Sequence, residues 1–316
     1  MTGMTAVALV PVFFGLALGY LAGKRRVVEY KDVEGLNTFL LNYAVPAALF
    51  LAAAQTPRHE LISHGKLSLA LSISMVSVFL GTLILEVKAF KFTPADSSAL
   101  LLAVSSPNFV AVAFPVFIAL YGPHSTAPVA VAVLCGNMVI VPLTLLLLEA
   151  GGRPSVPTSL LNRYFSALLR SLKKPVVLAP AFGLCLSLAG YAVPPVWIRS
   201  LDFFAATVPG VSLFVTGVVL SRESFFIDLN VFGGLLIKLV AQPLLTFVIA
   251  AFLLEYPQQI VRDAVLLMAC PGGFFGILFA VNYHARTREA VSVLLLSSAA
   301  CALTLSIVIP LLAFIR

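Results

Sequence analysis

Two short stretches of polar and helix-breaking residues lie inside strongly apolar parts of the chain. The first is SSPNFVAVAFP, Ser105 to Pro115, and the second is CPGGFFG, Cys270 to Gly276. Proline removes a backbone donor and clashes with the preceding turn, and glycine costs roughly 1 kcal/mol against alanine in a helix. Both stretches therefore predict breaks. A helix that begins after a break presents free N–H groups and the positive end of its dipole, and both favour a bound anion.

From these breaks we predict an anion site. Its contacts are assigned to polar and small residues near the breaks, Ser106, Asn108, Asn137, Gly272 and Gly273, and the breaks themselves to Pro107, Pro115, Pro271 and Gly276. Three alternatives stay open at this point. The prolines can merely kink continuous helices, Asn137 can bridge two helices without touching a substrate, and Ser105 and Ser106 can bond back to helix carbonyls.

Lys238 is the one strongly basic residue well inside an apolar segment, and Gln242 follows it at i+4 on the same helix face. A charge at the bilayer centre costs at least ~3 kcal/mol unless it is paired. We expect Lys238 and Gln242 to compensate the carbonyl ends of a broken helix. The alternative is that the lysine extends to the inner membrane interface.

The composition predicts the elements that carry these residues. The chain is 60% hydrophobic and 10% charged, with a mean hydropathy of +1.06, and its charges cluster between apolar runs long enough to span a bilayer. We therefore expect an all-α polytopic membrane protein with ten transmembrane segments, at about 6–22, 36–54, 67–87, 97–121, 127–149, 175–191, 202–221, 230–254, 263–283 and 289–315.

The distribution of basic residues predicts the orientation. Loops on the side of Lys24 hold 14 Lys and Arg residues, whereas the other side holds five, Arg58, Lys66, Arg199, Arg262 and Arg316. The positive-inside rule places both termini outside the cytoplasm and residues 150–174 inside. The same asymmetry accounts for the net charge of +7 without a nucleic-acid partner. A multi-pass plasma-membrane protein, in a bacterial inner membrane, is the expected localisation.

Four pairs of similar stretches recur in the same order along the chain. FFGLAL from Phe13 matches AFGLCL from Ala181, and AVPAALF from Ala44 matches TVPGVSLF from Thr207, with the prolines 163 residues apart. SPNFVAVAF matches CPGGFFGILF at an offset of 164, and VIVPLTLLL matches IVIPLLAF at 168. We interpret the chain as a duplicated unit of five segments. An odd number of segments makes the second copy inverted.

The repeat divides the chain into three parts. Residues 1–149 form the first five-helix repeat, 150–174 a basic cytoplasmic linker, and 175–316 the second, inverted repeat. The linker sequence SLLNRYFSALLRSL predicts a short amphipathic helix on the inner membrane surface. The prolines and glycines of the predicted fourth and ninth helices correspond between the copies, a pattern typical of transporters whose site lies between two broken, crossing helices.

SPNFVAVAFP resembles the crossover of the auxin efflux carrier family, which includes plant PIN-type carriers and bacterial carriers annotated for malonate. LNTFLLNYAVPAALF, KLVAQPLL and ACPGGFFGILFA resemble the family's second, eighth and ninth helices, and the resemblance covers essentially the whole chain. It implies a scaffold of helices one, two, six and seven, an elevator-type transport domain from the others, an anion-contacting Asn108 and a crossover proline at Pro115. The chain departs from the PIN pattern at Gly276, where that pattern has proline.

The leading functional hypothesis is a secondary active transporter of a small organic anion, with malonate or a related carboxylate as the expected substrate. The alternatives are an exporter of a larger aromatic, auxin-like carboxylate and a passive anion channel. An intramembrane enzyme is disfavoured because no embedded aspartate pair or serine–histidine pair is present. We expect no cofactor, and coupling to Na⁺, to H⁺ or to neither stays open.

Metal and partner predictions are brief. The four cysteines lie within predicted segments without C-x-x-C spacing, no H-E-x-x-H motif occurs, and no metal site is predicted. The expected partners are a small carboxylate and the lipid bilayer. A homodimer through the scaffold helices stays open.

Overall fold

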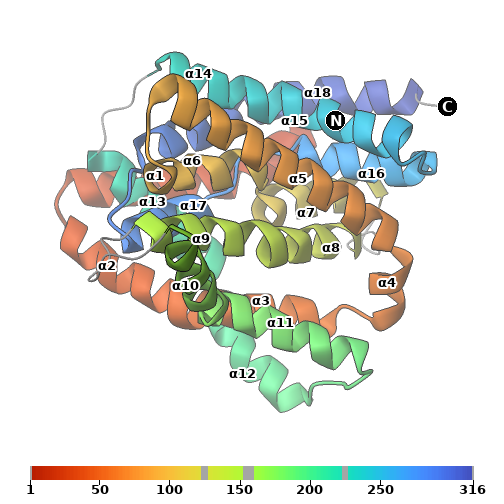
Figure 1. Cartoon of the computed structure of the whole chain (residues 1–316), viewed down its shortest axis with the longest axis horizontal. Helices are drawn as coiled ribbons and strands as arrows, with labels where there is room; N and C mark the ends of the chain where they lie inside the picture. The colour runs from red at the N-terminus through yellow and green to blue at the C-terminus, as the bar shows by residue number, and fades with distance from the viewer. Residues whose placement is uncertain (1, 122–126, 152–159, 223–226, 315–316) are drawn as a thin grey trace.

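The computed structural model describes residues 2–121, 127–151, 160–222 and 227–314. Within these residues the chain is almost entirely helical, and no strand is present apart from one isolated antiparallel bridge between Pro107 and Gly272. This agrees with the all-α prediction. Figure 1 shows the helices as a layered bundle, with α3, α11 and α12 towards the bottom of the view and α14, α15 and α18 towards the top.

The first half of the chain contains nine α-helices. They are α1 (Thr2–Lys24), α2 (Tyr30–Phe39), α3 (Val45–Gln55), α4 (Arg58–Ser63), α5 (Gly65–Leu85), α6 (Pro94–Ser105), α7 (Phe114–Tyr121), α8 (Ala127–Cys135) and α9 (Val141–Gly151) within the described residues. Single π-helical turns join α2 to α3, precede α7 and join α8 to α9, at Leu40–Ala44, Phe109–Ala113 and Gly136–Ile140. Such turns often mark functional positions in long helices.

The remaining described helices follow the linker. They are α10 (Leu160–Leu172), α11 (Pro175–Leu188), α12 (Pro195–Ala205), α13 (Val208–Arg222), α14 (Leu229–Leu236), α15 (Gln242–Val248), α16 (Gln258–Met268), α17 (Phe275–Asn282) and α18 (Arg288–Phe314). π-Helical turns follow α14 at Ile237–Ala241 and α15 at Ile249–Leu253. The α10 helix occupies the linker position where the sequence predicts an amphipathic helix, and part of the linker, 152–159, lies outside the described residues.

Sequence signals account for several helix starts. Proline is the first residue of α6, α11 and α12, where its missing N–H is no loss. The Thr93 side chain accepts a hydrogen bond from the Asp96 N–H at the start of α6, and Asp228 caps α14 through the Val231 N–H. These caps set where the apolar segments begin.

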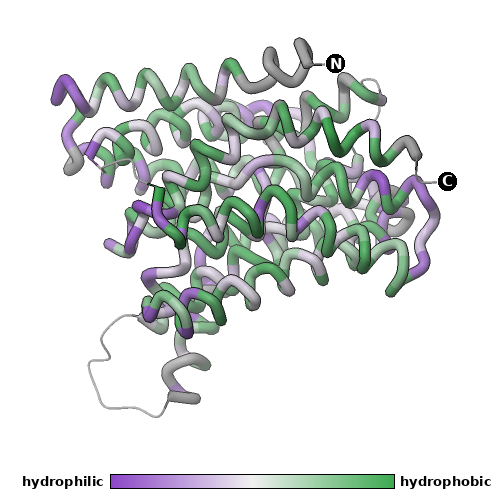
Figure 2. Tube along the Cα trace, turned by 90° about the horizontal axis from the view of Figure 1, so that it is seen from above, coloured by the Kyte–Doolittle hydropathy of each residue, from purple (hydrophilic) through white to green (hydrophobic). Residues whose placement is uncertain are grey.

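Five helical segments of the described chain are long and apolar enough to cross a membrane. They are Asp32–Gln55, Gly65–Phe90, Ala127–Gly151, Pro195–Arg222 and Leu229–Leu253, and α18, bent by 57°, is a sixth. Figure 2 shows hydrophobic residues along the helices and hydrophilic residues concentrated near their ends. The chain is thus a multi-pass membrane protein by length and composition. The other four predicted segments coincide with α1, α11 and two broken helices, so the number ten stays a prediction.

Two pairs of helices approach closely through glycine. A Cβ atom added at Gly19 of α1 would lie 2.0 Å from the carbonyl oxygen of Phe214 in α13. A Cβ atom added at Gly183 of α11 would lie 2.6 Å from the carbonyl oxygen of Phe50 in α3. Small residues allow such backbone-to-backbone packing in membranes, where dispersion contacts replace the hydrophobic effect between helices.

We predict that Gly19→Ala lowers the melting temperature of the purified protein, because the added methyl group overlaps backbone atoms that no side-chain rotation can move. The matched control is Gly81→Ala in α5, where no atom lies within 4 Å of an added Cβ. That variant should match or exceed the wild-type melting temperature, because alanine is the better helix former by roughly 1 kcal/mol. Equal melting temperatures for the two variants would contradict the packing of α1 on α13.

Candidate functional site

Two helices are interrupted in the buried interior of the bundle, and their breaks touch. The α6 helix ends at Ser105 and helical structure resumes at Phe109, while α16 ends at Met268 and α17 begins at Phe275. The Asn108 N–H donates to the Pro271 carbonyl at 2.8 Å, and the Gly273 N–H donates to the Ser106 carbonyl at 3.0 Å. The backbone at both breaks is extended rather than merely kinked. The unwound amides therefore satisfy one another where lipid offers no partner.

The second break requires glycine at the crossing, because no room is left there for a side chain. A Cβ atom at Gly272 would lie 2.7 Å from the Ala103 carbonyl oxygen, and one at Gly273 would lie 2.6 Å from the Ser106 carbonyl oxygen. Both contacts are with backbone atoms, so a larger residue would separate the two breaks. The Gly272 N–H donates to the Ser297 hydroxyl of α18 at 3.1 Å, which anchors the second break to a third helix.

The crossing itself involves Pro107 and Pro271, whereas the other two predicted crossover residues lie further along the chain. Pro115 is the second residue of α7, and Gly276 is the second residue of α17. A Cβ atom at Gly276 would lie 2.4 Å from the Ala99 carbonyl oxygen in α6. Gly276 therefore brings α17 close to α6, beyond the point where the chains cross.

The two half-helices that end at the breaks are capped by side chains from one neighbouring helix. Lys238 Nζ donates to the Met268 carbonyl oxygen, the last of α16, at 3.2 Å and also to Gln242 Oε1. Gln242 Nε2 donates to the Ser105 carbonyl oxygen, the last of α6, at 2.7 Å. Lys238 and Gln242 are both 0% exposed. This burial excludes the alternative in which Lys238 extends to the membrane interface.

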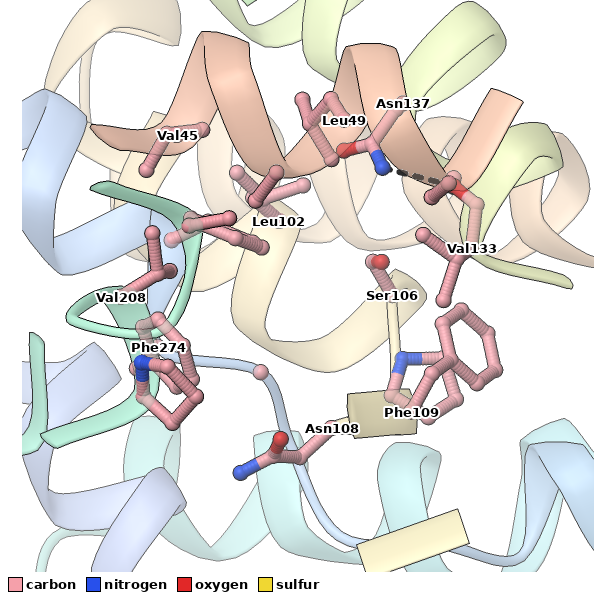
Figure 3. Close-up of a pocket in the computed structure, with 18 residues that line it drawn as sticks. Val45, Leu49, Leu102, Ser106, Asn108, Phe109, Val133, Asn137, Val208 and Phe274 are labelled. Atoms are coloured by element: carbon pink, nitrogen blue, oxygen red, sulfur yellow. Dashed lines mark hydrogen bonds between the residues drawn. The ribbon is translucent and has the colours of Figure 1, made fainter. Parts of the chain in front are cut away.

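The two half-helices that begin after the breaks lie beside a cavity of about 220 Å³. Figure 3 shows Ser106, Asn108 and Phe109 from the first break and Phe274 from the second beside it. Opposite them, α3 contributes Val45, Ala48, Leu49 and Ala52, the α12–α13 region contributes Ala205, Val208 and Pro209, and the α8–α9 segment contributes Val133, Gly136 and Asn137. No charged side chain is among the described lining residues.

The predicted polar residues occupy different positions around this cavity. Asn108 is 3% exposed and lies at the start of the second half-helix, and Ser106 is half-buried at the break. Asn137 also lines the cavity, but its Nδ2 donates to the Val133 carbonyl of its own helix at 2.8 Å. Ser105 bonds back to the Leu101 carbonyl at 2.6 Å and points into the α6 helix rather than the cavity.

Several lining residues are absent from the sequence prediction. Leu102, Phe109 and Phe274 are apolar residues in an apolar chain, so their type carries no signal. The internal repeat does contain a signal for two other lining residues. Val45 and Val208 are matching residues 163 positions apart, and both line the cavity. Both directly precede a proline that is matched between the copies, Pro46 and Pro209, so a search for residues beside matched prolines would have included them.

Comparison with known proteins adds the family. A family model described as "Membrane transport protein" matches residues 4–309. The chain belongs to this family. The match confirms the resemblance to auxin efflux carriers that was inferred from SPNFVAVAFP and its companion motifs.

Related proteins in this membrane transport family carry the same general description. The chain is 28% identical over 291 residues to an uncharacterized transporter, YfdV, of Escherichia coli K12, with 92% of this chain and 91% of the relative aligned. The same identity and coverage hold for the proteins of that name in Escherichia coli O157:H7 and Shigella flexneri. The relatives are named as transporters rather than enzymes, and this chain is a membrane transporter of their family.

We predict that Gln242→Ala destabilises the protein by about 1–3 kcal/mol, because it leaves the Ser105 carbonyl without its side-chain partner and the Lys238 ammonium with the Met268 carbonyl alone. Thermal unfolding in detergent measures the change. Gln258→Ala is the matched control, because Gln258 is exposed at the start of α16. If both alanine variants melt with the wild-type protein, Gln242 does not hold the end of α6.

Proposed function

We propose that the protein is a secondary active carrier of a small organic anion, which binds at the crossing of the two broken helices and moves by alternating access. The observation that supports this most directly is the cavity beside the starts of the two half-helices, at Phe109 in the π-helical turn that precedes α7 and at Phe275 in α17. The first N–H groups of a helix have no partner within it, and the helix dipole places roughly half a positive charge there. Two such starts at one cavity favour a carboxylate.

The partial charges of the two helix starts also limit how many carboxylates a substrate can carry. Two helix starts supply about one positive charge in total, and the described cavity lining contributes no lysine, arginine or histidine. A dianion such as malonate would leave its second carboxylate uncompensated in an apolar pocket, at a large desolvation cost. Of the two substrate classes predicted from sequence, we favour a monocarboxylate with an apolar body, and malonate becomes the alternative.

The apolar lining supports an apolar substrate body. Leu49, Leu102 and Val208 line the cavity on the side away from Asn108 (Figure 3), and Phe274 adds an aromatic ring to the lining. Ligand sites of this type combine an apolar wall with a few polar groups that set orientation. Asn108 supplies the polar group nearest to the helix start, and we assign it the contact with the carboxylate.

Helix packing supports the inverted repeat of five and five helices. Gly15 of α1 approaches Leu213 of α13, and Gly183 of α11 approaches Phe50 of α3. Gly183 lies 168 residues after Gly15, and Leu213 lies 163 residues after Phe50, which are the offsets of the sequence repeat. The contact is therefore made twice with the copies exchanged, as a twofold axis requires. Such symmetry is typical of carriers with alternating access.

We assign the packing of α1, α3, α11, α12 and α13 to the scaffold and the crossing to the moving transport domain. The cavity lies between these groups, because α3 and the α12–α13 region form one wall and the two breaks form another. A substrate bound there would contact both parts, which is the arrangement that an elevator-type motion needs. A passive channel is the remaining alternative. Dependence of liposome flux on a counter-gradient would separate it from a carrier.

We predict that monocarboxylates stabilise the protein more than dicarboxylates of similar shape, in two matched pairs of ligands. Phenylacetate should raise the melting temperature of the purified protein at pH 7.5 more than phenylmalonate, and propionate more than malonate, because each second carboxylate lacks a partner. Asn108→Ala should weaken phenylacetate binding roughly ten- to a hundredfold, the value of one charge-assisted hydrogen bond, and Asn108→Asp should weaken it further by repulsion.

The control is Asn42→Ala, a substitution at an exposed asparagine that does not line this cavity. It should bind phenylacetate as the wild-type protein does. If both dicarboxylates stabilised the protein more than their matched monocarboxylates, malonate would again be the favoured substrate. Wild-type affinity in both Asn108 variants would remove the crossing as the anion site.

The orientation is a further part of the proposal, with both termini outside the cytoplasm and α10 inside. In a background without native cysteines, Lys173→Cys after α10 should resist an impermeant thiol reagent in intact cells, because the positive-inside rule places it in the cytoplasm. Arg199→Cys in α12 should react, and both positions are exposed in the structure. The opposite labelling pattern would invert the topology.

A further inference from the structure

Lys238 is a buried lysine without a carboxylate partner among the described residues. Its side chain is 0% exposed, and its Nζ donates to the Met268 carbonyl oxygen and to Gln242 Oε1. Among the described residues, no aspartate or glutamate forms an ion pair with it. An embedded charge of this kind is costly, and its partners here are neutral oxygen atoms. The free energy that retains the charge must come from the surrounding dipoles.

Two helix ends supply those dipoles. The final carbonyl groups of α6 and α16 converge on the Lys238–Gln242 pair, and each helix end carries roughly half a negative charge. One ammonium group therefore matches the two ends in total charge. It contacts α16 directly and α6 through the Gln242 amide, whose oxygen faces the ammonium and whose nitrogen faces the Ser105 carbonyl.

Neighbouring hydroxyl groups are already paired. Thr246 Oγ1 donates to the Gln242 carbonyl at 2.7 Å, and the Ser74 and Thr246 hydroxyl oxygens lie 2.6 Å apart within hydrogen-bond distance. All of these groups are fully buried. The network thus has one cationic position, and Lys238 Nζ fills it.

In carriers with broken helices, unwound carbonyls and half-helix C-terminal ends are the groups that coordinate a transported Na⁺ or H⁺. We propose that the Lys238 ammonium is a resident cation in that position, so that the protein neither binds nor requires Na⁺ there. The consequence of this resident cation for the coupling of transport rests on the proposed carrier function. Substrate then moves without a sodium ion, and each turnover carries only the charge of the substrate and of the protein's own moving groups.

The proposal predicts that removing the Lys238 side chain creates a binding site for a monovalent cation. Lys238→Ala leaves oxygen atoms of Met268 and Gln242 around a space from which a cation has been removed. Lys238→Met also removes the charge but fills most of the space with an apolar side chain of similar length. A monovalent cation should therefore bind the alanine variant and not the methionine variant.

The experiment measures ²²Na⁺ binding and thermal unfolding of the purified full chain, in NaCl or in choline chloride of equal concentration. We expect the wild-type protein to bind no Na⁺ above background and to melt at the same temperature in both salts. Lys238→Ala should melt lower in choline chloride, regain stability in NaCl or methylammonium chloride, and bind ²²Na⁺. Lys238→Met should melt lower in both salts. Lys88→Ala, at an exposed lysine in the turn that follows α5, should behave as wild type.

Saturable ²²Na⁺ binding or sodium stabilisation of the wild-type protein would overturn the proposal, even if Lys238→Ala does not fold. Equal responses of Lys238→Ala and Lys238→Met to sodium would also overturn it, because the effect would then be independent of the vacated position. Neither measurement uses a transported substrate. Failure of the carboxylates to bind would therefore count against the carrier function and leave the resident cation intact.

Discussion

Every backbone amide inside a bilayer needs a partner within the protein, and the crossing of two broken helices is built around that constraint. Breaking a helix releases N–H and C=O groups at its ends, and in this chain those groups come together in pairs. The Asn108 N–H and the Pro271 carbonyl satisfy each other across the crossing, as do the Gly273 N–H and the Ser106 carbonyl. Glycine at 272 and 273 is the condition for this approach, because backbone atoms lie where a Cβ would be.

The crossing also separates charge within the apolar interior. The negative ends of α6 and α16 face Lys238 and Gln242, which are fully buried, while the starts of the following half-helices face the cavity. An ammonium group on one side of the breaks and a carboxylate on the other would each face a helix end of opposite charge. The proposed anion site and the proposed resident cation are thus two consequences of the same pair of breaks.

The surrounding helices hold this arrangement in place by close packing rather than by ion pairs at depth. Gly19 and Gly183 let α1 and α11 contact the backbones of α13 and α3. Ion pairs between described residues lie near helix ends, where Glu149 pairs with Arg170 and Lys174, and Arg286 pairs with Glu289. The crossing is one of the places where the interior holds polar side chains, among them Asn108, Lys238 and Gln242.

Sequence alone determined the class of protein and the positions of the breaks, and it predicts that the breaks correspond between two copies. Length and polarity of the apolar runs indicate membrane helices, and Pro107, Asn108, Pro271 and the glycines mark where helices cannot continue, because these effects are local to the backbone. That Lys238 and Gln242 share one helix face also follows from their spacing, whereas their burial is seen only in the structure.

Only the tertiary structure decided which groups meet. That Lys238 reaches Met268 and that Gln242 reaches Ser105 depend on how distant segments pack. The bond of Asn137 to Val133 is local, but only the structure distinguishes it from a bond to another helix. The cavity wall of Leu102, Val208 and Phe274 has no sequence signature, because apolar residues are common to every segment and only their placement makes a pocket. The local free energy of a proline or glycine can be read from the chain, whereas the partners of a buried group are set by the fold as a whole.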